Sequence, residues 1–358
     1  MGHRLRVLID YAHEDLWESL ELLFTDRFGW ELYRPIGMDW HTEGYWRFES
    51  EAVARQFLEP WPDDVGVTDW ERDDSGVAHP LVAHSERGSI PHPNRRQKMW
   101  TLEQARDMKP DLVIATLAEN EPGLHRFAQE VGAHYGIQVG NQGAPNQWGA
   151  AEFAMLSVTT PGFTPWMPHV TYHQEFDLDV YRHDWPPSEP NLIANRVQCI
   201  TGTHLYKRFR RIAEDMPKMR FRWYGHCGEP DEHYGGDTPY VGDIADSMRA
   251  SLAGWHAKEW SDGYGHVIHA WFAVGRPTFV SGTYYADKFA GALMEHGVTC
   301  YDLDRMSDTE VVDTIGRLRV LGDEHRAMSE AAAARFREVV DFDAEAEAIR
   351  AMLEGVMS

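Results

Sequence analysis

A glycine-rich stretch in the second half of the chain has the residues of an anion-binding loop. It reads Ser261-Asp262-Gly263-Tyr264-Gly265-His266 and leads into a short apolar segment that is expected to form a helix. Glycines let backbone N–H groups approach an anion closely, and the helix that follows directs the positive end of its dipole at the same point. Gly275 is expected to end this helix, and Thr278 to Val280 must be a strand. The geometry suits the diphosphate of a nucleotide.

Strand-like and helix-like segments alternate along both halves of the chain and would position such a loop. Strands are expected at 6–11, 30–36, 112–116, 137–140, 153–158, 196–200, 220–224, 278–280 and 298–301, with a strand or loop at 254–260. Helices are expected at 13–28, 51–58, 101–108, 121–135, 203–215, 242–253, 284–296, 307–321 and 324–357. The rest of 37–100 gives no clear pattern. Alternation over ~30 residues predicts parallel βαβ units and an α/β fold.

A proline-rich segment separates the two halves. The chain has 358 residues, which suits two domains of ~150 residues each. We predict an N-terminal domain at 1–183, a linker at 184–190, a C-terminal domain at 191–340 and a C-terminal helix at 341–358. The last helix is a candidate to cross back to the first domain. Two successive α/β halves predict a ligand cleft between them.

Composition and charge narrow the function classes. The formal net charge of −23 opposes attraction to nucleic acid or to anionic membranes. Two groups of basic residues could still line a groove or simply be solvated: 95–98, and the larger set Lys207, Arg208, Arg210, Arg211, Lys218, Arg220 and Arg222. Cys199, Cys227 and Cys300 offer no disulfide framework. Because the sequence has no apolar run long enough to cross a bilayer, we predict a cytoplasmic protein with no membrane span.

The stretch from about 241 to 340 resembles the C-terminal half of retaining nucleotide-sugar glycosyltransferases with the GT-B architecture. In that family an acidic residue, a glycine, an aromatic residue and a glycine precede a second acidic residue and a small apolar helix that ends Gly-x-Pro. Asp262 falls on the first acidic position, and Gly275 and Pro277 match the helix end. The second acidic position falls on Ala270, which cannot hydrogen-bond a nucleotide ribose. The N-terminal half is only loosely similar, and the whole chain also resembles bacteriophage glycosyltransferases.

The resemblance implies a fold, an activity and a set of donor-binding residues. It implies two Rossmann-like domains that face a cleft, and an enzyme that transfers a hexosyl or pentosyl group from a nucleotide sugar to a hydroxyl of a glycan, protein or small molecule. The leaving diphosphate must be stabilised as it gains charge. The residues implied for donor binding are His256, Lys258, Asp262, Gly263, Tyr264, Gly265 and His266.

The acceptor side is expected in the N-terminal half. His13 follows the first predicted strand, where inverting members of the family often place a catalytic base, and a neutral histidine can take a hydroxyl proton near pH 7. Asp10 is the competing base, and His13 is equally well explained as a helix residue without a chemical role. Asn141 and Gln142 follow another predicted strand and are candidates for acceptor contacts, although a plain turn explains them equally well.

No metal or cofactor is expected besides the donor, for which UDP- or GDP-linked sugars are favoured. The 19 histidines are mostly scattered, and His266 and His269 lack a third zinc ligand. Asp302-Leu303-Asp304 and Asp341-Phe342-Asp343 have metal-binding spacing, but both lie late in the chain. Three alternatives stay open. They are transfer to hydroxymethylated bases in DNA, epimerisation of a nucleotide sugar on the same scaffold, and non-catalytic binding of a nucleotide sugar.

Overall fold

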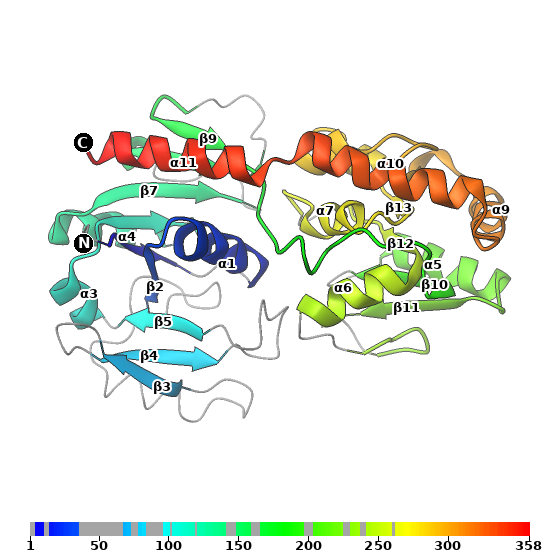
Figure 1. Ribbon diagram of the computed structural model, residues 1–358, viewed down its shortest axis with the longest axis horizontal. Coiled ribbons are helices and arrows are strands. Elements are labelled where there is room, and N and C mark those ends of the chain that lie inside the picture. The colour runs from blue at the N-terminus through cyan, green and yellow to red at the C-terminus, as the bar shows by residue number, and fades with distance from the viewer. Residues whose placement is uncertain are drawn as a thin grey trace. The chain divides into compact units, whose positions relative to one another are not determined.

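The computed structural model describes residues 4–10, 14–35, 67–72, 78–83, 96–100, 102–118, 120–140, 148–158, 165–196, 203–224, 230–236, 241–259 and 262–358. The chain divides into two compact units, each with its own sheet (Figure 1). Unit 1 comprises Met1–Glu86, Ile90–Phe176 and Phe342–Ser358, and unit 2 comprises Arg87–Ser89 and Asp177–Asp341. The predicted linker at 184–190 therefore lies inside unit 2, whereas the last helix returns to unit 1.

The sheet of unit 1 is built on a parallel α/β core. Its strands are β1 (Arg6–Ile9), β2 (Glu31–Pro35), β3 (Val67–Arg72), β4 (Ala78–Ala83), β5 (Arg96–Trp100), β6 (Leu112–Ala115), β7 (His134–Val139), β8 (Phe153–Leu156) and β9 (His169–Thr171). They lie in the order β3-β4-β5-β2-β1-β6-β7-β8-β9. β4 pairs antiparallel with β3 and β5, and the other pairs are parallel. The antiparallel β3–β4–β5 segment extends one edge.

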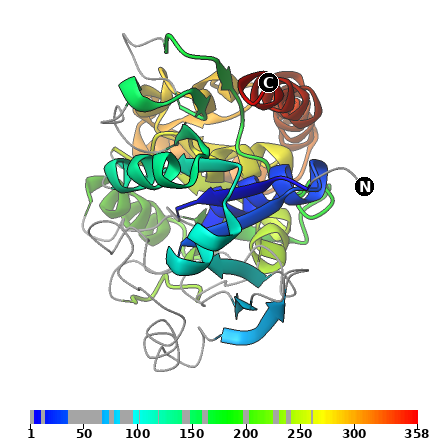
Figure 2. The same ribbon diagram turned by 90° about the vertical axis from the view of Figure 1, so that its left-hand side faces the viewer.

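Helices cover both faces of this sheet. α1 (Glu14–Glu21), which continues as a π-helix (Leu22–Arg27), shares an apolar cluster with α11 (Phe342–Val356). Leu16 and Trp17 meet Ile349 and Leu353 there, over side chains of β1, β6 and β8. α4 (Glu121–Val131) packs against β6 and β7 on the other face, and α3 (Leu102–Met108) packs against β5. A single turn of 3-10 helix, Trp148–Ala150, precedes β8. Figure 2 looks onto this unit, with α11 in red and α1 in blue.

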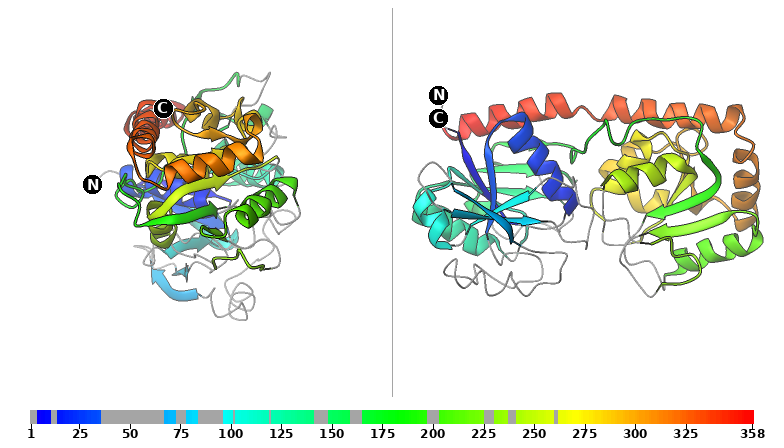
Figure 3. Two further views of the ribbon diagram at one scale, coloured as in Figure 1. Left: turned by 90° about the vertical axis from the view of Figure 1, so that its right-hand side faces the viewer. Right: turned by 60° about the horizontal axis from the view of Figure 1, so that its bottom comes forward.

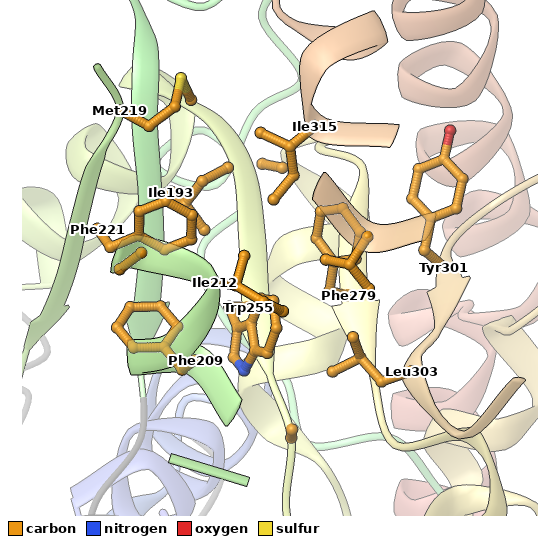
Figure 4. Close-up of a cluster of buried hydrophobic side chains, with 14 of the residues drawn as sticks. Ile193, Phe209, Ile212, Met219, Phe221, Trp255, Phe279, Tyr301, Leu303 and Ile315 are labelled. Carbon is orange, nitrogen blue, oxygen red and sulfur yellow. The ribbon is translucent and has the colours of Figure 1, made fainter. Parts of the chain in front are cut away.

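Unit 2 has a parallel sheet in the order β11-β10-β12-β13-β14. Its strands are β10 (Glu189–Arg196), β11 (Arg220–Tyr224), β12 (Ser251–His256), β13 (Thr278–Val280) and β14 (Tyr301–Asp302). Its helices are α5 (His204–Asp215), α6 (Val241–Ala250), α7 (His266–Ala273), α8 (Gly282–Tyr285), α9 (Asp308–Leu318) and α10 (Asp323–Val339), with 3-10 turns at Phe289–Leu293 and Leu303–Arg305. Aromatic side chains dominate the core between the strands, α5 and α9, where Phe209 contacts Phe221 and Trp255 edge-on (Figure 4).

Several predicted element boundaries were wrong, and local backbone geometry explains two of them. The helix expected at 121–135 ends at Val131, because Gly132 adopts a left-handed conformation with φ of 77°. Gly136 does not stop that helix but lies in β7, where an added Cβ would come within 2.2 Å of the Phe153 ring. The strand expected at 196–200 is displaced, since β10 begins at Glu189 within the proline-rich segment.

The helix expected at 242–253 ends at Ala250, because Ser251–His256 pairs with β10 and β13 as strand β12. Further differences concern short elements. The helix expected at 284–296 is broken into α8 and the 3-10 turn Phe289–Leu293, and the strand expected at 298–301 is β14, at Tyr301–Asp302. The helix expected at 51–58 lies outside the described residues. Within the part of the chain that the structure describes, no helix is both long enough and apolar enough to cross a bilayer.

Candidate functional site

The sheet of unit 2 has a switch point between β10 and β12. The chain passes from β10 to β11 on one side and then returns to β12 on the other side of β10. In open parallel sheets, ligands bind outside the carboxyl ends of the strands at such a point. β12 ends at His256, and the chain continues through Lys258 and Asp262 into α7. The glycine loop predicted from the sequence therefore lies at the expected edge of the sheet.

Close packing fixes α7 against this sheet. The indole of Trp271 is fully buried, and a Cβ added to Gly254 of β12 would come within 2.6 Å of it. At the other end of the helix, Gly275 has φ of 65°. The Arg276 guanidinium that follows is buried and donates to the carbonyl oxygens of Arg249 and Asp184. Burial lowers the pKa of Arg276 to about 10. These contacts anchor the helix whose N-terminus follows the loop.

Gly265 makes the turn into α7. It has φ of 84°, and an added Cβ would come within 2.7 Å of the Ala290 Cβ. A residue other than glycine would be strained there by its backbone and by its neighbour. The first turn of a helix presents N–H groups that its own carbonyls cannot reach, at the positive end of the dipole. The turn and the helix expected from the sequence are therefore present, and anion binding at this point stays a prediction.

The carboxylate of Asp262 organises the loop from inside. Its Oδ1 accepts the Gly265 N–H at 2.7 Å. Its Oδ2 accepts the Tyr285 hydroxyl at 2.8 Å and lies 3.4 Å from His256 Nε2 and 3.5 Å from Lys258 Nζ. Burial alone would raise the pKa of the Asp262 carboxyl, but the hydrogen bond from His256 and the charge of Lys258 lower it below its ordinary value. Asp262 is therefore an ionised group held within the protein.

Two other predicted donor-binding side chains are also directed inward. Tyr264 is fully buried, and its ring stacks on His269 with centroids 4.3 Å apart and an interplanar angle of 7°. His256 is fully buried as well. Ala270, on the second acidic position of the resemblance, is 1% exposed and packs in the core. The side chain of Lys258, which is 18% exposed, the half-buried His266 at the start of α7 and the backbone of the loop remain as the groups that can meet an anion.

A hollow of about 470 Å³ lies at the same edge of the sheet, beside the carboxyl ends of β13 and β14. Val280, Gly282, Met294, Asp302 and Arg305 are among the residues that line it. Asp302 shapes one wall, since its carboxylate accepts the Gly282 N–H at 3.0 Å and pairs with Arg305 at 3.1 Å. None of the described residues of the glycine loop lines this hollow.

In unit 1, Asp10 lies at the end of β1, where that sheet also has its switch point between β1 and β6. Its carboxylate is buried and accepts hydrogen bonds from the Thr116 N–H and hydroxyl, the Leu117 N–H and the Asn120 amide at 2.6 to 3.1 Å. Burial raises the pKa of Asp10 to about 6, although the hydrogen bonds from Asn120 and Thr116 act in the opposite direction. With four donors around it, Asp10 ties β1 to the chain after β6.

The other predicted acceptor-side residues, His13, Asn141 and Gln142, lie outside the described residues. Sequence reasoning missed Thr116 and Asn120, the partners of Asp10, and Tyr284 and Tyr285, which hold the loop of unit 2. Nothing in the spacing of these four residues marks them, because each acts through a contact between distant segments of the chain.

Several arginines of the larger basic group, residues 207–222, form ion pairs with acidic side chains. Arg208 and Arg211 of α5 both bind Asp308 at the start of α9, and Figure 3 shows these two helices in unit 2. Two further pairs join Arg210 to Glu232 and Arg220 to Glu189. Four of the seven basic residues in this group are therefore paired with three carboxylates. Among the described residues, no three His, Cys, Asp or Glu side chains are placed to hold a metal ion.

Solved structures resemble the chain over nearly its whole length. The pneumococcal O-GlcNAc transferase GtfA, in complex with UDP and GlcNAc, matches with a TM-score of 0.60 and 11% identity, covering 99% of this chain and 100% of that chain. HepE of Anabaena, in complex with UDP-glucose, matches with a TM-score of 0.62 and 12% identity over 99% and 100%. The protein has the GT-B fold. No protein-family model and no curated protein sequence matches it.

The GT-B fold of this chain also resembles that of an α-glucosyltransferase in complex with UDP-glucose and DNA containing an abasic site. That match has a TM-score of 0.54 and 9% identity, covering 99% of this chain and 100% of the other. The predicted α/β architecture with two Rossmann-like units and a returning C-terminal helix is confirmed. At such low sequence identity the similarity shows the fold alone. An activity must therefore be argued from the residues of the site.

Proposed function

We propose that the protein is a glycosyltransferase that moves a sugar from a nucleotide-sugar donor to a hydroxyl acceptor. The observation that carries this proposal is the glycine loop before α7, which lies at the switch point of unit 2 with Lys258 beside it. Similar structures of the same fold contain UDP or UDP-glucose, which supports a uridine-linked donor over a GDP-linked one.

The residues of the loop would act on the leaving group. As the glycosidic bond breaks, the nucleoside diphosphate gains negative charge, and donors placed where that charge develops lower the barrier. The ammonium of Lys258, the N-terminus of α7 and the amide of Gly263 are such groups, whereas the Gly265 N–H is already bound by the Asp262 carboxylate. We infer that they do this without a metal ion. His13 stays our candidate for the base that takes the acceptor proton, since Asp10 is enclosed by its own hydrogen bonds.

A thermal-shift screen against UDP, GDP, ADP and CMP sugars tests the donor. A ligand that binds only the native state must raise the unfolding temperature, and we expect UDP-sugars to do so. In Lys258→Ala the affinity for the same donor should fall about tenfold, as expected for the loss of a charge-assisted contact. Arg319→Ala serves as a control, because this arginine donates to Asn191 outside the loop. Equal donor binding by Lys258→Ala and wild type would contradict the role of Lys258.

DNA is the second candidate acceptor, favoured by the structural similarity to a glucosyltransferase bound to DNA. The net charge of −23 and the ion pairs of Arg208, Arg210 and Arg211 weigh against it. Binding to DNA through phosphates weakens steeply with salt, so a salt titration separates a true DNA acceptor from other partners.

Product analysis without an acceptor separates the remaining candidates. An epimerase converts its donor alone, whereas a transferase releases free sugar slowly by hydrolysis. A binding protein without activity does neither. Because the number and spacing of the three cysteines in the sequence suggest no disulfide framework, we also infer that the enzyme acts in the cytoplasm, in that of a bacterial host if a bacteriophage encodes it.

A further inference from the structure

Two adjacent tyrosines of α8 hold the glycine loop in different ways. The hydroxyl of Tyr284 contacts the backbone of Asp262, accepting its N–H at 2.9 Å and donating to its carbonyl oxygen at 3.0 Å. The hydroxyl of Tyr285 donates to the Asp262 carboxylate at 2.8 Å. Tyr284 therefore fixes the backbone of the loop, and Tyr285 fixes the side chain at its centre.

His256 completes the contacts of this side chain. Its Nε2 lies 3.0 Å from the Tyr285 hydroxyl. Because that hydroxyl gives its one hydrogen to Asp262, it must accept from the histidine, which assigns the N–H to Nε2. His256 and Tyr285 are both fully buried, so water does not compete for these bonds. The carboxylate is thus held at one oxygen by the tyrosine and the histidine, and at the other by the Gly265 N–H.

Lys258 depends on this carboxylate. Its ammonium lies 3.5 Å from the same Asp262 oxygen that Tyr285 and His256 contact. A lysine stem has four rotatable bonds, so a fixed anionic partner decides where its charge resides. The position of the carboxylate therefore sets the position of the ammonium.

We propose that Tyr285 and His256 are positioning residues, which act through Asp262 to place the ammonium of Lys258 where it meets the diphosphate of the donor. The inference rests on the proposed function, in which Lys258 contacts that diphosphate. Neither Tyr285 nor His256 needs to touch the donor, because both act from inside the protein.

Calorimetric titration with UDP tests this role in Tyr285→Phe. The measurement is made well below the unfolding temperature of each variant, so that a loss of stability alone leaves the affinity unchanged. We expect the Kd for UDP to rise about tenfold, as for a lost hydrogen bond to a charged group. Tyr301→Phe is the matched control: it removes a hydroxyl that bonds Glu324 at 3.1 Å in the same unit, and its Kd should stay unchanged.

Two substitutions at His256 provide a second test if Tyr285→Phe fails to fold. Glutamine can still donate an N–H to the Tyr285 hydroxyl, whereas leucine cannot. We expect His256→Gln to keep most of the affinity for UDP and His256→Leu to lose about as much as Tyr285→Phe. If wild type binds neither UDP nor GDP, the proposed function fails. If wild type binds UDP and the Tyr285→Phe and His256→Leu variants bind it equally well, the positioning role is overturned and the proposed function stands.

Discussion

Single residues in this protein show how one buried carboxylate can hold two segments of the chain together. Asp262 in unit 2 and Asp10 in unit 1 both lie at the switch point of their sheet, and both are buried. Each binds backbone N–H groups of a neighbouring segment, Gly265 in one case and Thr116 in the other. The sequence indicated that both residues matter, but their type and spacing suggest contact with a substrate. Only the fold shows that their hydrogen bonds point inward.

Gly265 gives the sharpest prediction at this scale. Gly265→Ala places a Cβ 2.7 Å from Ala290 at φ of 84°, so we expect it to cost about 1–3 kcal/mol of unfolding free energy and to weaken binding of UDP. Gly316→Ala in α9 is the matched control, because nothing lies within 4 Å of its added Cβ. That helical substitution should be neutral or should stabilise by about 0.5–1 kcal/mol. Equal effects of the two substitutions on UDP binding would contradict the role of Gly265.

We expect the stability of unit 2 to depend on pH through the buried side chain of His325 in α10. Its Nδ1 accepts the Trp185 indole N–H at 3.1 Å and its Nε2 lies 2.9 Å from the Leu252 carbonyl oxygen, so the ring is held neutral. Burial and the charge of Arg276 lower its pKa, although the bond to Leu252 raises it. The unfolded chain then binds a proton more readily than the native one. The stability that the neutral His325 ring contributes is therefore fully present above about pH 6.5 and is lost as the pH falls below that value.

The measurement compares wild type with His325→Gln, whose amide can make both bonds without titrating. Between pH 7 and pH 5 the unfolding temperature of wild type should fall further than that of the variant. Parallel pH profiles would show that His325 does not titrate on unfolding.

At the scale of elements, the sequence predicted those with a clear apolar run or cap and missed those without one. β11, β13 and α5 were placed nearly correctly, because an apolar run or a Thr203 cap marks them. The β3–β4–β5 segment was not predicted, since its pairing at the sheet edge leaves little trace in hydrophobic periodicity. The loop before α7 was predicted from its glycines, whereas the α8 tyrosines that hold it were not. A glycine-rich loop can be recognised in the sequence. The side chains that hold it cannot, because they come from elements that only the fold brings together.

At the scale of the whole molecule, unit 1 is completed by the end of the described chain. α11 follows unit 2 in sequence, yet Ile349 and Leu353 are buried against α1 and the sheet of unit 1. Salt bridges from Arg27 to Asp343 and Glu175 tie the start of this helix to the same unit. The helix is thus part of the core of unit 1 and not an appendage.

Truncation after Asp341 tests this assignment. Loss of Ile349 and Leu353 alone removes about 3 kcal/mol or more of hydrophobic stabilisation from unit 1. Hydrogen exchange should therefore become faster in β1 and β8, while β12 in unit 2 keeps its protection. Unchanged exchange in β1 would contradict the role of α11 in that core.

The return of α11 also has a consequence for how the protein is made. Most of unit 1 is translated before unit 2, but the apolar surface around Leu16 and Trp17 lacks its cover until residues 342–356 have left the ribosome. Unit 2 is complete earlier, when residue 341 has emerged. Of the two units, the one that is translated earlier is therefore completed later, and during that interval its uncovered apolar surface needs protection from aggregation.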